Sequence, residues 1–134
     1  MGLHINFVLE KKMLLTEILK KLSEPVPKQY LSSRSQGGAR LTYISWSNYC
    51  VLLDQRAGKG SWSWEIKSMV TTANHLFLVG RLTIFGSDGE IAFEATGEEK
   101  LACSSFGDPS SNAEAMSLRR ACAKLGLSRE LWLK

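Results

Sequence analysis

The chain has 134 residues, of which 44% are hydrophobic and 22% charged, and this is typical of a single globular domain. No apolar run approaches the roughly 18 residues that a membrane helix needs. Three widely spaced cysteines and two histidines predict neither a disulfide framework nor a zinc site, so we expect no metal and no cofactor. These features indicate an intracellular protein, located in the cytoplasm or nucleoid of a bacterium, or in the nucleus or an organelle of a eukaryote.

The net charge of +4 is unevenly distributed along the chain. Residues 1–40 carry +4, residues 41–109 carry −3 and residues 110–134 carry +3. Positive charge at both ends favours a polyanionic partner, because a basic stripe attracts phosphates. A solvated surface is the alternative interpretation of the same pattern.

The spacing of apolar residues predicts two helices in the first half of the chain. The first covers residues 13–23 and ends before Pro25. Residues 24–40 are rich in proline, glycine and serine and are expected to form a loop. The second helix begins near Ser45 and stops at Gly58. Its predicted buried residues are Trp46, Tyr49, Cys50 and Leu53. Stacking on nucleobases by Tyr43 and Trp46 is the alternative to a core role for Trp46.

Three strands are predicted to follow. Apolar and polar residues alternate over residues 62–70, as in a half-buried strand. Residues 76–85 are apolar on both faces, so we place this strand at the centre of the sheet. The turn signal at residues 86–89 joins it to a third strand over residues 91–95.

A polar loop over residues 103–110 leads into the last helix. Ser111 and Glu114 form a predicted capping box, and Gly126 ends the helix. Its predicted core residues are Ala115, Leu118, Cys122 and Leu125. We therefore expect an α+β fold, in which a three-stranded antiparallel β-meander packs on a C-terminal helix to give a β-β-β-α core, preceded by N-terminal helices.

The chain lacks the motifs of common enzymes. Residues 56–61, R-A-G-K-G-S, do not have the spacing of a phosphate-binding loop, and no zinc-protease or serine-hydrolase motif is present. Glu94, Glu98 and Glu99 come nearest to the carboxylate cluster of a metal-dependent nuclease, but strand alternation separates them. We therefore predict no catalytic residue and no enzymatic activity.

Two groups of basic residues are candidate binding sites. On the last helix, Arg119, Arg120 and Lys124 lie away from the predicted core face. The like charges of Arg120 and Lys124, one turn apart, repel each other unless an external anion neutralises them. In the glycine-rich stretch, Arg34 and Arg40 lie among serines that could also donate to an anion. An ordinary solvated helix face and a flexible surface loop are the alternatives.

Residues 30–34, Y-L-S-S-R, are followed by residues 41–44, L-T-Y-I. These two segments resemble the opening segment of the Rad-fifty-two/Rad-twenty-two family of single-strand annealing proteins. Residues 60–63, G-S-W-S, resemble the glycine–tryptophan start of its hairpin. Residues 113–127 resemble a helix of its bacterial and phage branch, which includes DdrA-like damage-response proteins.

The resemblance implies a ring-forming domain that binds single-stranded DNA in a positively charged groove. Such a domain promotes ATP-independent annealing of complementary strands in homologous recombination and DNA double-strand break repair. The phosphates face the protein, and the bases are turned outward. The predicted DNA-binding residues are Arg34, Arg40, Tyr43, Arg119, Arg120 and Lys124. Of these, Arg34, Arg119 and Arg120 match the family's phosphate contacts, Tyr43 lies beside them, and the match of Lys124 is offset by one residue.

The resemblance also sets expectations for domains and partners. Residues 1–24 are expected to form a helical segment that contacts other subunits, and residues 25–134 are expected to form the DNA-binding and annealing domain. The expected partners are single-stranded DNA, further copies of the chain in a ring, and a recombinase or a single-strand binding protein, but no membrane. Two other functions stay open: a module that protects DNA ends or loads a recombinase without annealing, and a small metal-dependent nuclease.

Overall fold

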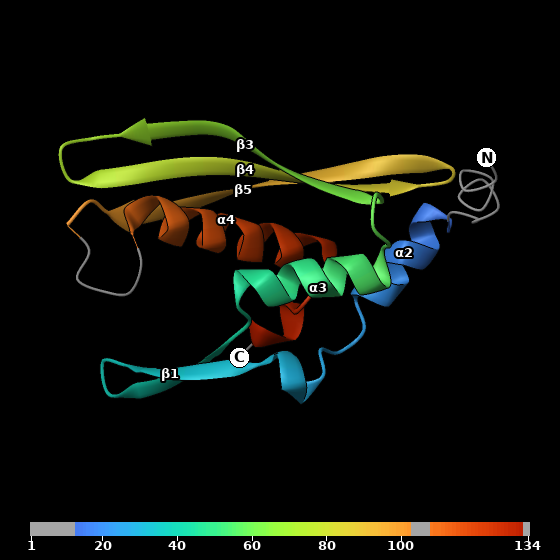
Figure 1. Cartoon of the computed structure of the whole chain (residues 1–134), viewed down its shortest axis with the longest axis horizontal. Helices are drawn as coiled ribbons and strands as arrows, with labels where there is room; N and C mark the ends of the chain where they lie inside the picture. The colour runs from blue at the N-terminus through green and yellow to red at the C-terminus, as the bar shows by residue number, and fades with distance from the viewer. Residues whose placement is uncertain (1–12, 103–107, 133–134) are drawn as a thin grey trace, which may run out of the picture.

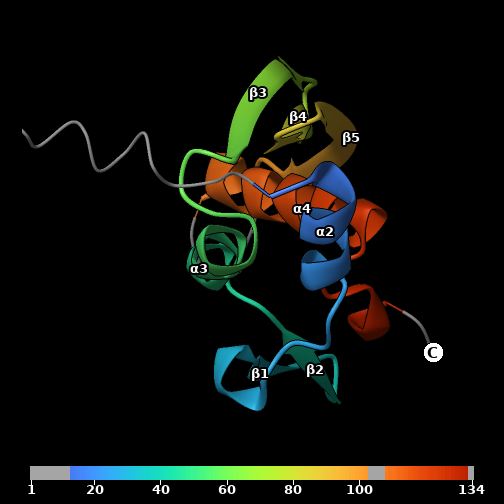
Figure 2. The ribbon, with the colours of Figure 1, turned by 90° about the vertical axis from the view of Figure 1, so that its right-hand side faces the viewer.

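A three-stranded antiparallel sheet covers one side of the molecule (Figure 1). The structure, a computed structural model, describes residues 13–102 and 108–132. In chain order the elements are α2 (Leu15–Leu22), the 3-10 helix η1 (Lys28–Tyr30), β1 (Ser32–Gln36), β2 (Ala39–Tyr43), α3 (Trp46–Arg56), β3 (Trp62–Thr71), β4 (His75–Gly86), β5 (Gly89–Lys100), α4 (Pro109–Leu125) and the 3-10 helix η2 (Arg129–Leu131). Helices lie beneath the sheet, and the small β1-β2 hairpin lies on the far side of these helices (Figures 1 and 2).

The sheet presents an apolar face to α4, which runs along it lengthwise (Figure 1). Leu78, Leu82 and Ile84 of β4 are buried, and β4 is the central strand of the order β3-β4-β5, as predicted. The helix approaches β5 closely because Gly97 has no Cβ, and a Cβ there would collide with the main-chain carbonyl of Ala113. The predicted α+β fold, with a meander packed on the C-terminal helix, is confirmed.

A buried polar network joins α4 to the centre of the sheet. The pairing of β3 with β4 shifts its register between Ile66 and Ser68, opposite Gly80. The Gly80 N–H donates to Ser117 Oγ at 3.1 Å, and Ser117 Oγ donates to the Ala95 carbonyl at 2.7 Å. Because Ser117 is fully buried, these bonds satisfy polar groups that water does not reach.

Replacing Ser117 with alanine is expected to lower the free energy of unfolding by about 1–3 kcal/mol, because the Gly80 N–H would stay buried without its acceptor. Urea denaturation followed by tryptophan fluorescence measures the change. The control is Ser87→Ala at an exposed turn position, which should change stability by less than about 0.5 kcal/mol. Equal urea midpoints for the two variants would contradict a stabilising role for the network.

Helix α2 packs into the main core of the subunit. The helix predicted over residues 13–23 is confirmed, and its Ile18 and Leu22 are fully buried. Arg56, at the end of α3, donates to the Leu22 carbonyl at 3.2 Å and so ties the two helices together. Residues 1–12 lie outside the described residues, and the subunit contact assigned to residues 1–24 stays a prediction. The apolar face of α2 is already used within the subunit.

The prediction of a loop over residues 24–40 is wrong for residues 32–40, which belong to the β1-β2 hairpin. Gln36 pairs with Ala39 across the turn residues Gly37 and Gly38, whose φ angles are +57° and +80°. Positive φ at both positions is typical of two-residue hairpin turns, and glycine adopts it without steric cost. The strands escaped prediction because β1 reads S-S-R-S-Q and shows no alternation of apolar residues.

Helix α3 follows the hairpin, with Ser45 as its N-cap, where the sequence places its start. Tyr49 and Leu53 are buried as predicted. The prediction of a buried Trp46 is wrong, because this side chain is 61% exposed, and Cys50 is only half-buried. Both residues line a cavity at the surface and do not pack in the core.

Helix α4 begins earlier than predicted, and most of the polar loop expected before it lies outside the described residues. Asp108 is the N-cap and accepts the Ser111 N–H at 2.9 Å. This backbone bond, with side-chain bonds from Ser110 and Ser111, lowers the pKa of the Asp108 carboxyl. The expected capping box is wrong, because Glu114 accepts a hydrogen bond from the Trp64 indole.

The core face of α4 is largely as predicted. Leu118, Cys122 and Leu125 are buried, whereas Ala115 is half-buried at the edge of a cavity. Gly126 ends the helix in the left-handed conformation, with φ of +109°, as predicted. Over residues 13–102 and 108–132, no helix is long and apolar enough to span a membrane.

Candidate nucleic-acid interface

A groove of about 500 Å³ lies where the β1-β2 hairpin meets α4, α3 and the segment that follows α4. We call it the basic groove. Its principal lining residues are Arg34, Arg40, Tyr43, Tyr49, Arg119 and Trp132. Figure 2 shows the hairpin below the helices that supply the other side. The fold therefore brings together four of the six predicted DNA-binding residues, which come from two distant segments of the sequence.

The hairpin contributes Arg34 and Tyr43 from one face of its ladder, and Arg40, which pairs with Ser35, from the other face. Arg34 pairs with Leu41 in the ladder, and Ser32 pairs with Tyr43, so Arg34 and Tyr43 lie diagonally across the same face. The guanidinium carbon of Arg34 lies 5.4 Å from the centre of the Tyr43 ring, which makes a cation–π contact. This contact orients the guanidinium and leaves its N–H donors available for an anion.

Arg119 of α4 is the most enclosed cation of the groove. Burial, the largest cause, lowers the pKa of its guanidinium, and the nearby charges of Arg34 and Arg120 lower it further, while neighbouring tyrosines partly offset the shift. Among the described residues, the recorded ion pair joins Arg81 to Glu94, and no carboxylate pairs with Arg119. A half-buried cation without an acidic partner favours an anion supplied from outside the protein.

The far wall of the groove is held in place by buried hydrogen bonds. The hydroxyl of Tyr49 lies 2.9 Å from Ser128 Oγ, and Ser128 adopts a left-handed φ of +63° just after α4. Burial raises the pKa of Tyr49 to about 12, so its hydroxyl is neutral at physiological pH. Glu130 accepts the Val26 N–H at 3.1 Å and ties the segment to the chain after α2. Trp132, 47% exposed, lies at the end of this wall.

Arg120 and Lys124 are not brought into the basic groove. Arg120 Nη1 donates to the carbonyl and to Oγ1 of Thr96 at 3.1 and 3.2 Å, and Lys124 Nζ donates to the Glu94 carbonyl at 2.6 Å. These carbonyls belong to alternate residues of β5, so both cations cover the free edge of the sheet. Their repulsion is relieved by main-chain acceptors inside the protein, and their contact with DNA stays a prediction.

The residues considered as candidates for a phosphate-binding loop or a nuclease site do not form such a site in the described structure. Residues 56–61 begin at the last residue of α3, Arg56, which donates to main-chain carbonyls near the end of α2. The ladder places Glu94 and Glu98 on the face of β5 opposite to that of Glu99. Within residues 13–102 and 108–132, no group of three or more histidine, cysteine, aspartate or glutamate side chains could hold a metal ion.

Two aromatic residues of the groove, Tyr49 and Trp132, were not among the predicted site residues. Sequence reasoning assigns Tyr49 to the core, where it is indeed buried, but it lines the groove as well. Trp132 follows the basic helix within a few residues, and an aromatic side chain in that place suits stacking on bases. That proximity is the signal by which sequence reasoning could have found it.

An α+β domain that gathers arginines from distant segments into one groove is typical of a nucleic-acid-binding protein. The family model described as "Rad52/22 family double-strand break repair protein" matches residues 15–92. The chain is 35% identical over 120 residues to "DNA repair RAD52-like protein 1, mitochondrial" of Arabidopsis thaliana, which covers 88% of this chain and 67% of that protein. It is 33% identical over 122 residues to "DNA repair RAD52-like protein 2, chloroplastic" of the same plant, which covers 88% of this chain and 60% of that protein. The chain therefore belongs to the Rad52/22 family of double-strand break repair proteins.

The family membership confirms the family-level resemblance seen in the sequence. The matched residues 15–92 include the hairpin with Arg34, Arg40 and Tyr43, whereas Arg119 lies beyond them. Both relatives come from a plant, so these matches do not place the chain in the bacterial and phage branch that the last helix indicated. The chain spans less than two thirds of the length of the second relative.

Proposed function

We propose that the chain binds single-stranded DNA in the basic groove and promotes ATP-independent annealing of complementary strands in homologous recombination and double-strand break repair. The observation that carries this proposal is Arg119, a half-buried cation without a carboxylate partner among the described residues, in the same groove as Arg34 and Arg40. Phosphates supply the missing negative charge. Tyr43 holds Arg34 in position beside the strand.

The proposed mechanism needs no bound nucleotide. Two DNA strands repel each other, and each strand folds on itself, so pairing in solution is slow. Arginines that neutralise phosphates release counterions and hold the backbone extended. With the phosphates against the groove, the bases point outward and a second strand can pair with them.

We further infer that identical subunits assemble head to tail into a ring or a helix. A single groove holds only a few nucleotides, and joining subunits makes later contacts intramolecular, which multiplies the avidity. The sheet supports such an assembly, because β3 forms a free edge and exposed apolar side chains lie on β3 and β4. These side chains are Ile66, Met69, Val70 and Phe77. They add a second candidate surface to the predicted contact at residues 1–24.

We also infer that the protein acts in an organelle that contains DNA. The printed names of the two relatives, one mitochondrial and one chloroplastic, support this location. A recombinase and a single-strand binding protein stay the expected protein partners. A module that protects DNA ends or loads a recombinase without annealing is the alternative activity.

Binding to single-stranded DNA should weaken roughly 20-fold between about 50 and 200 mM salt, because each phosphate that the three groove arginines neutralise contributes about 0.7 to the logarithmic salt slope. Fluorescence anisotropy with a labelled oligonucleotide measures the slope. Arg34→Ala should lower the slope by about 0.7 and weaken binding. Arg81→Ala is the matched control, because it removes the same charge from the sheet face that points away from α4. A flat salt response in the unmodified protein would contradict the groove.

Annealing is tested separately with two complementary oligonucleotides that carry a donor and an acceptor dye. The protein should accelerate their pairing without ATP, and Arg34→Ala should slow it more than Arg81→Ala does. Tight binding without any acceleration would favour the end-protecting module. Light scattering on the same samples should show particles much larger than one subunit, and a strict monomer with and without DNA would contradict the assembly.

A further inference from the structure

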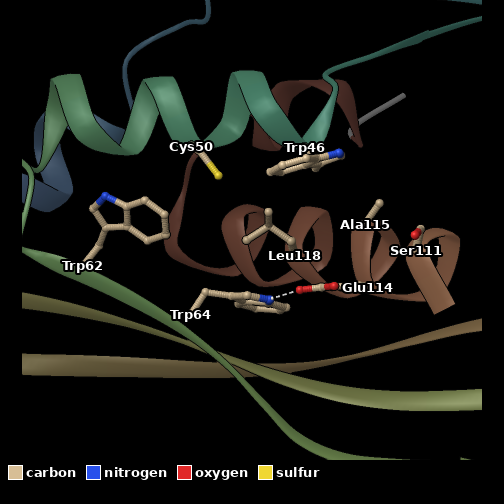
Figure 3. A pocket seen from close by; sticks show the side chains of 8 residues that line it. All are labelled: Trp46, Cys50, Trp62, Trp64, Ser111, Glu114, Ala115 and Leu118. Carbon is tan, nitrogen blue, oxygen red and sulfur yellow. Dashed lines mark hydrogen bonds between the residues drawn. The ribbon is translucent and has the colours of Figure 1, made fainter.

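A second cavity, of about 290 Å³, opens between α3, the start of β3 and the first half of α4. We call it the tryptophan cavity. Its principal lining residues are Trp46, Cys50, Trp62, Trp64, Glu114 and Leu118. Figure 3 shows the rings of Trp46 and Trp64 on opposite sides of it, both seen nearly edge-on, with Leu118 between them. In the described part of the chain, the cavity and the basic groove share no lining residue.

The two tryptophans of β3 are held rigidly. The Trp64 indole N–H donates to Glu114 Oε2 at 2.8 Å, and the Trp62 indole N–H donates to Asp54 Oδ1 at 2.8 Å. One face of Trp64 packs over Gly80, where a Cβ would collide with the ring. The sheet therefore fixes the position of Trp64 and leaves its other face to the cavity (Figure 3).

Trp46 is placed differently. It stands in the first turn of α3, it is 61% exposed, and no hydrogen bond to its indole is recorded among the described residues. In that part of the chain its ring makes no contact with another aromatic ring, and the side chain of Leu118 lies between it and Trp64 (Figure 3). An indole with this exposure leaves much apolar surface in water, which a flat apolar ligand would cover.

The chemistry of the cavity fits a nucleobase better than a phosphate. Within the described residues, no lysine or arginine lines it, so it offers nothing to neutralise a phosphate. The exposed indole of Trp46 can stack on a flat ring. Glu114 uses one oxygen for Trp64, and among the described residues its other oxygen has no hydrogen-bond donor, so it can accept an N–H from the exocyclic amino group of a base.

The cavity adjoins the basic groove along two elements. Leu118 lines the cavity and the next residue of α4, Arg119, lines the groove. On the other side, Ile44 lines the groove, and Trp46 lines the cavity two residues later. The two sites therefore draw on the same stretches of α4 and of the chain before α3, and we infer that a strand in the groove passes near the cavity.

We propose that the tryptophan cavity takes in one base of the DNA strand that is bound in the basic groove. Trp46 stacks on this base, and Glu114 accepts a hydrogen bond from the amino group of the base. This inference rests on the proposed function and deepens it. It predicts that each subunit withholds one base from pairing and prefers the bases with an exocyclic amino group, cytosine, adenine and guanine, to thymine at that place. Thymine lacks an exocyclic amino group, and its ring N–H lies between two carbonyl oxygens that repel the carboxylate.

The test compares an oligo(dC) with an abasic strand of equal length, which keeps the phosphates but has no bases. Trp46→Ala should weaken binding of oligo(dC) by about 5- to 150-fold and leave binding of the abasic strand within about 2-fold. Trp46→Phe should retain part of the affinity, because phenylalanine still stacks. Val51→Ala, which changes another exposed apolar residue of α3, is the control and should bind both strands normally. Thermal melting confirms that each variant folds.

A second variant tests the role of the carboxylate. Glu114→Gln keeps an acceptor for Trp64 and removes the charge, so it should reduce the preference for oligo(dC) over oligo(dT) toward equality. The proposal is overturned if Trp46→Ala weakens binding of oligo(dC) and of the abasic strand equally, or weakens neither. In that case the salt dependence and the effect of Arg34→Ala would still support the groove. If Trp46→Ala forms smaller particles than the unmodified protein and its binding does not depend on the bases, the proposal is also overturned. The cavity would then hold a side chain of a second copy. Loss of the salt dependence itself would instead defeat the proposed function.

Discussion

Arg119→Met should weaken binding of single-stranded DNA by about 10- to 150-fold, because a hydrogen bond to a charged group contributes about 1.5–3 kcal/mol. The same substitution should leave the melting temperature unchanged or raise it. Methionine keeps the aliphatic length of arginine and removes a half-buried charge that has no carboxylate partner in the described part of the chain. Anisotropy and thermal melting of the same samples measure both quantities.

Two further variants test whether DNA binding depends on the position of the Arg119 charge or only on the net charge of the protein. Arg81→Met removes an equal charge from the opposite face of the sheet, where the Arg81–Glu94 pair is exposed and contributes little to stability. It should therefore affect DNA binding far less. Arg119→Lys keeps the charge but loses the forked donors and should bind with intermediate affinity. An equal loss from Arg119→Met and Arg81→Met would show that only net charge matters.

Gly97→Ala should lower the free energy of unfolding by about 3 kcal/mol, at the upper end of the usual cost of overpacking. A Cβ at this position would collide with the Ala113 carbonyl and would lie 2.9 Å from the Ser117 amide nitrogen. Both are main-chain atoms of α4, so no side chain can turn aside to make room. The helix must lift away from β5, which also disturbs the network at Ser117. Urea denaturation measures the loss.

The control for this variant is its neighbour. Glu98→Ala changes an exposed side chain on the opposite face of β5 and should shift stability by less than about 0.5 kcal/mol. If Gly97→Ala unfolds at the same urea concentration as Glu98→Ala, then α4 does not rest on β5 as closely as the structure shows.

Elements with a periodic apolar pattern were predictable from the sequence. The helix around Ile18, the three strands of the meander and the last helix up to Gly126 all follow from it, because burial against one face imposes the spacing of apolar residues. The β1-β2 hairpin carries no such pattern, since it does not form part of the main sheet. The sequence feature that indicates this hairpin is the Gly37-Gly38 pair, and such a pair is equally typical of a loop.

The sequence alone determined the α+β architecture, the family and the basic residue types that a DNA groove requires. Only the tertiary structure decided which of these residues act together. Arg119 and Arg120 are neighbours in the chain, yet a helix turns successive side chains about 100° apart. One therefore enters the groove beside Arg34, and the other reaches the β5 edge at Thr96. The distances that separate them depend on how α4 packs between the sheet and the hairpin, and no local pattern records that packing.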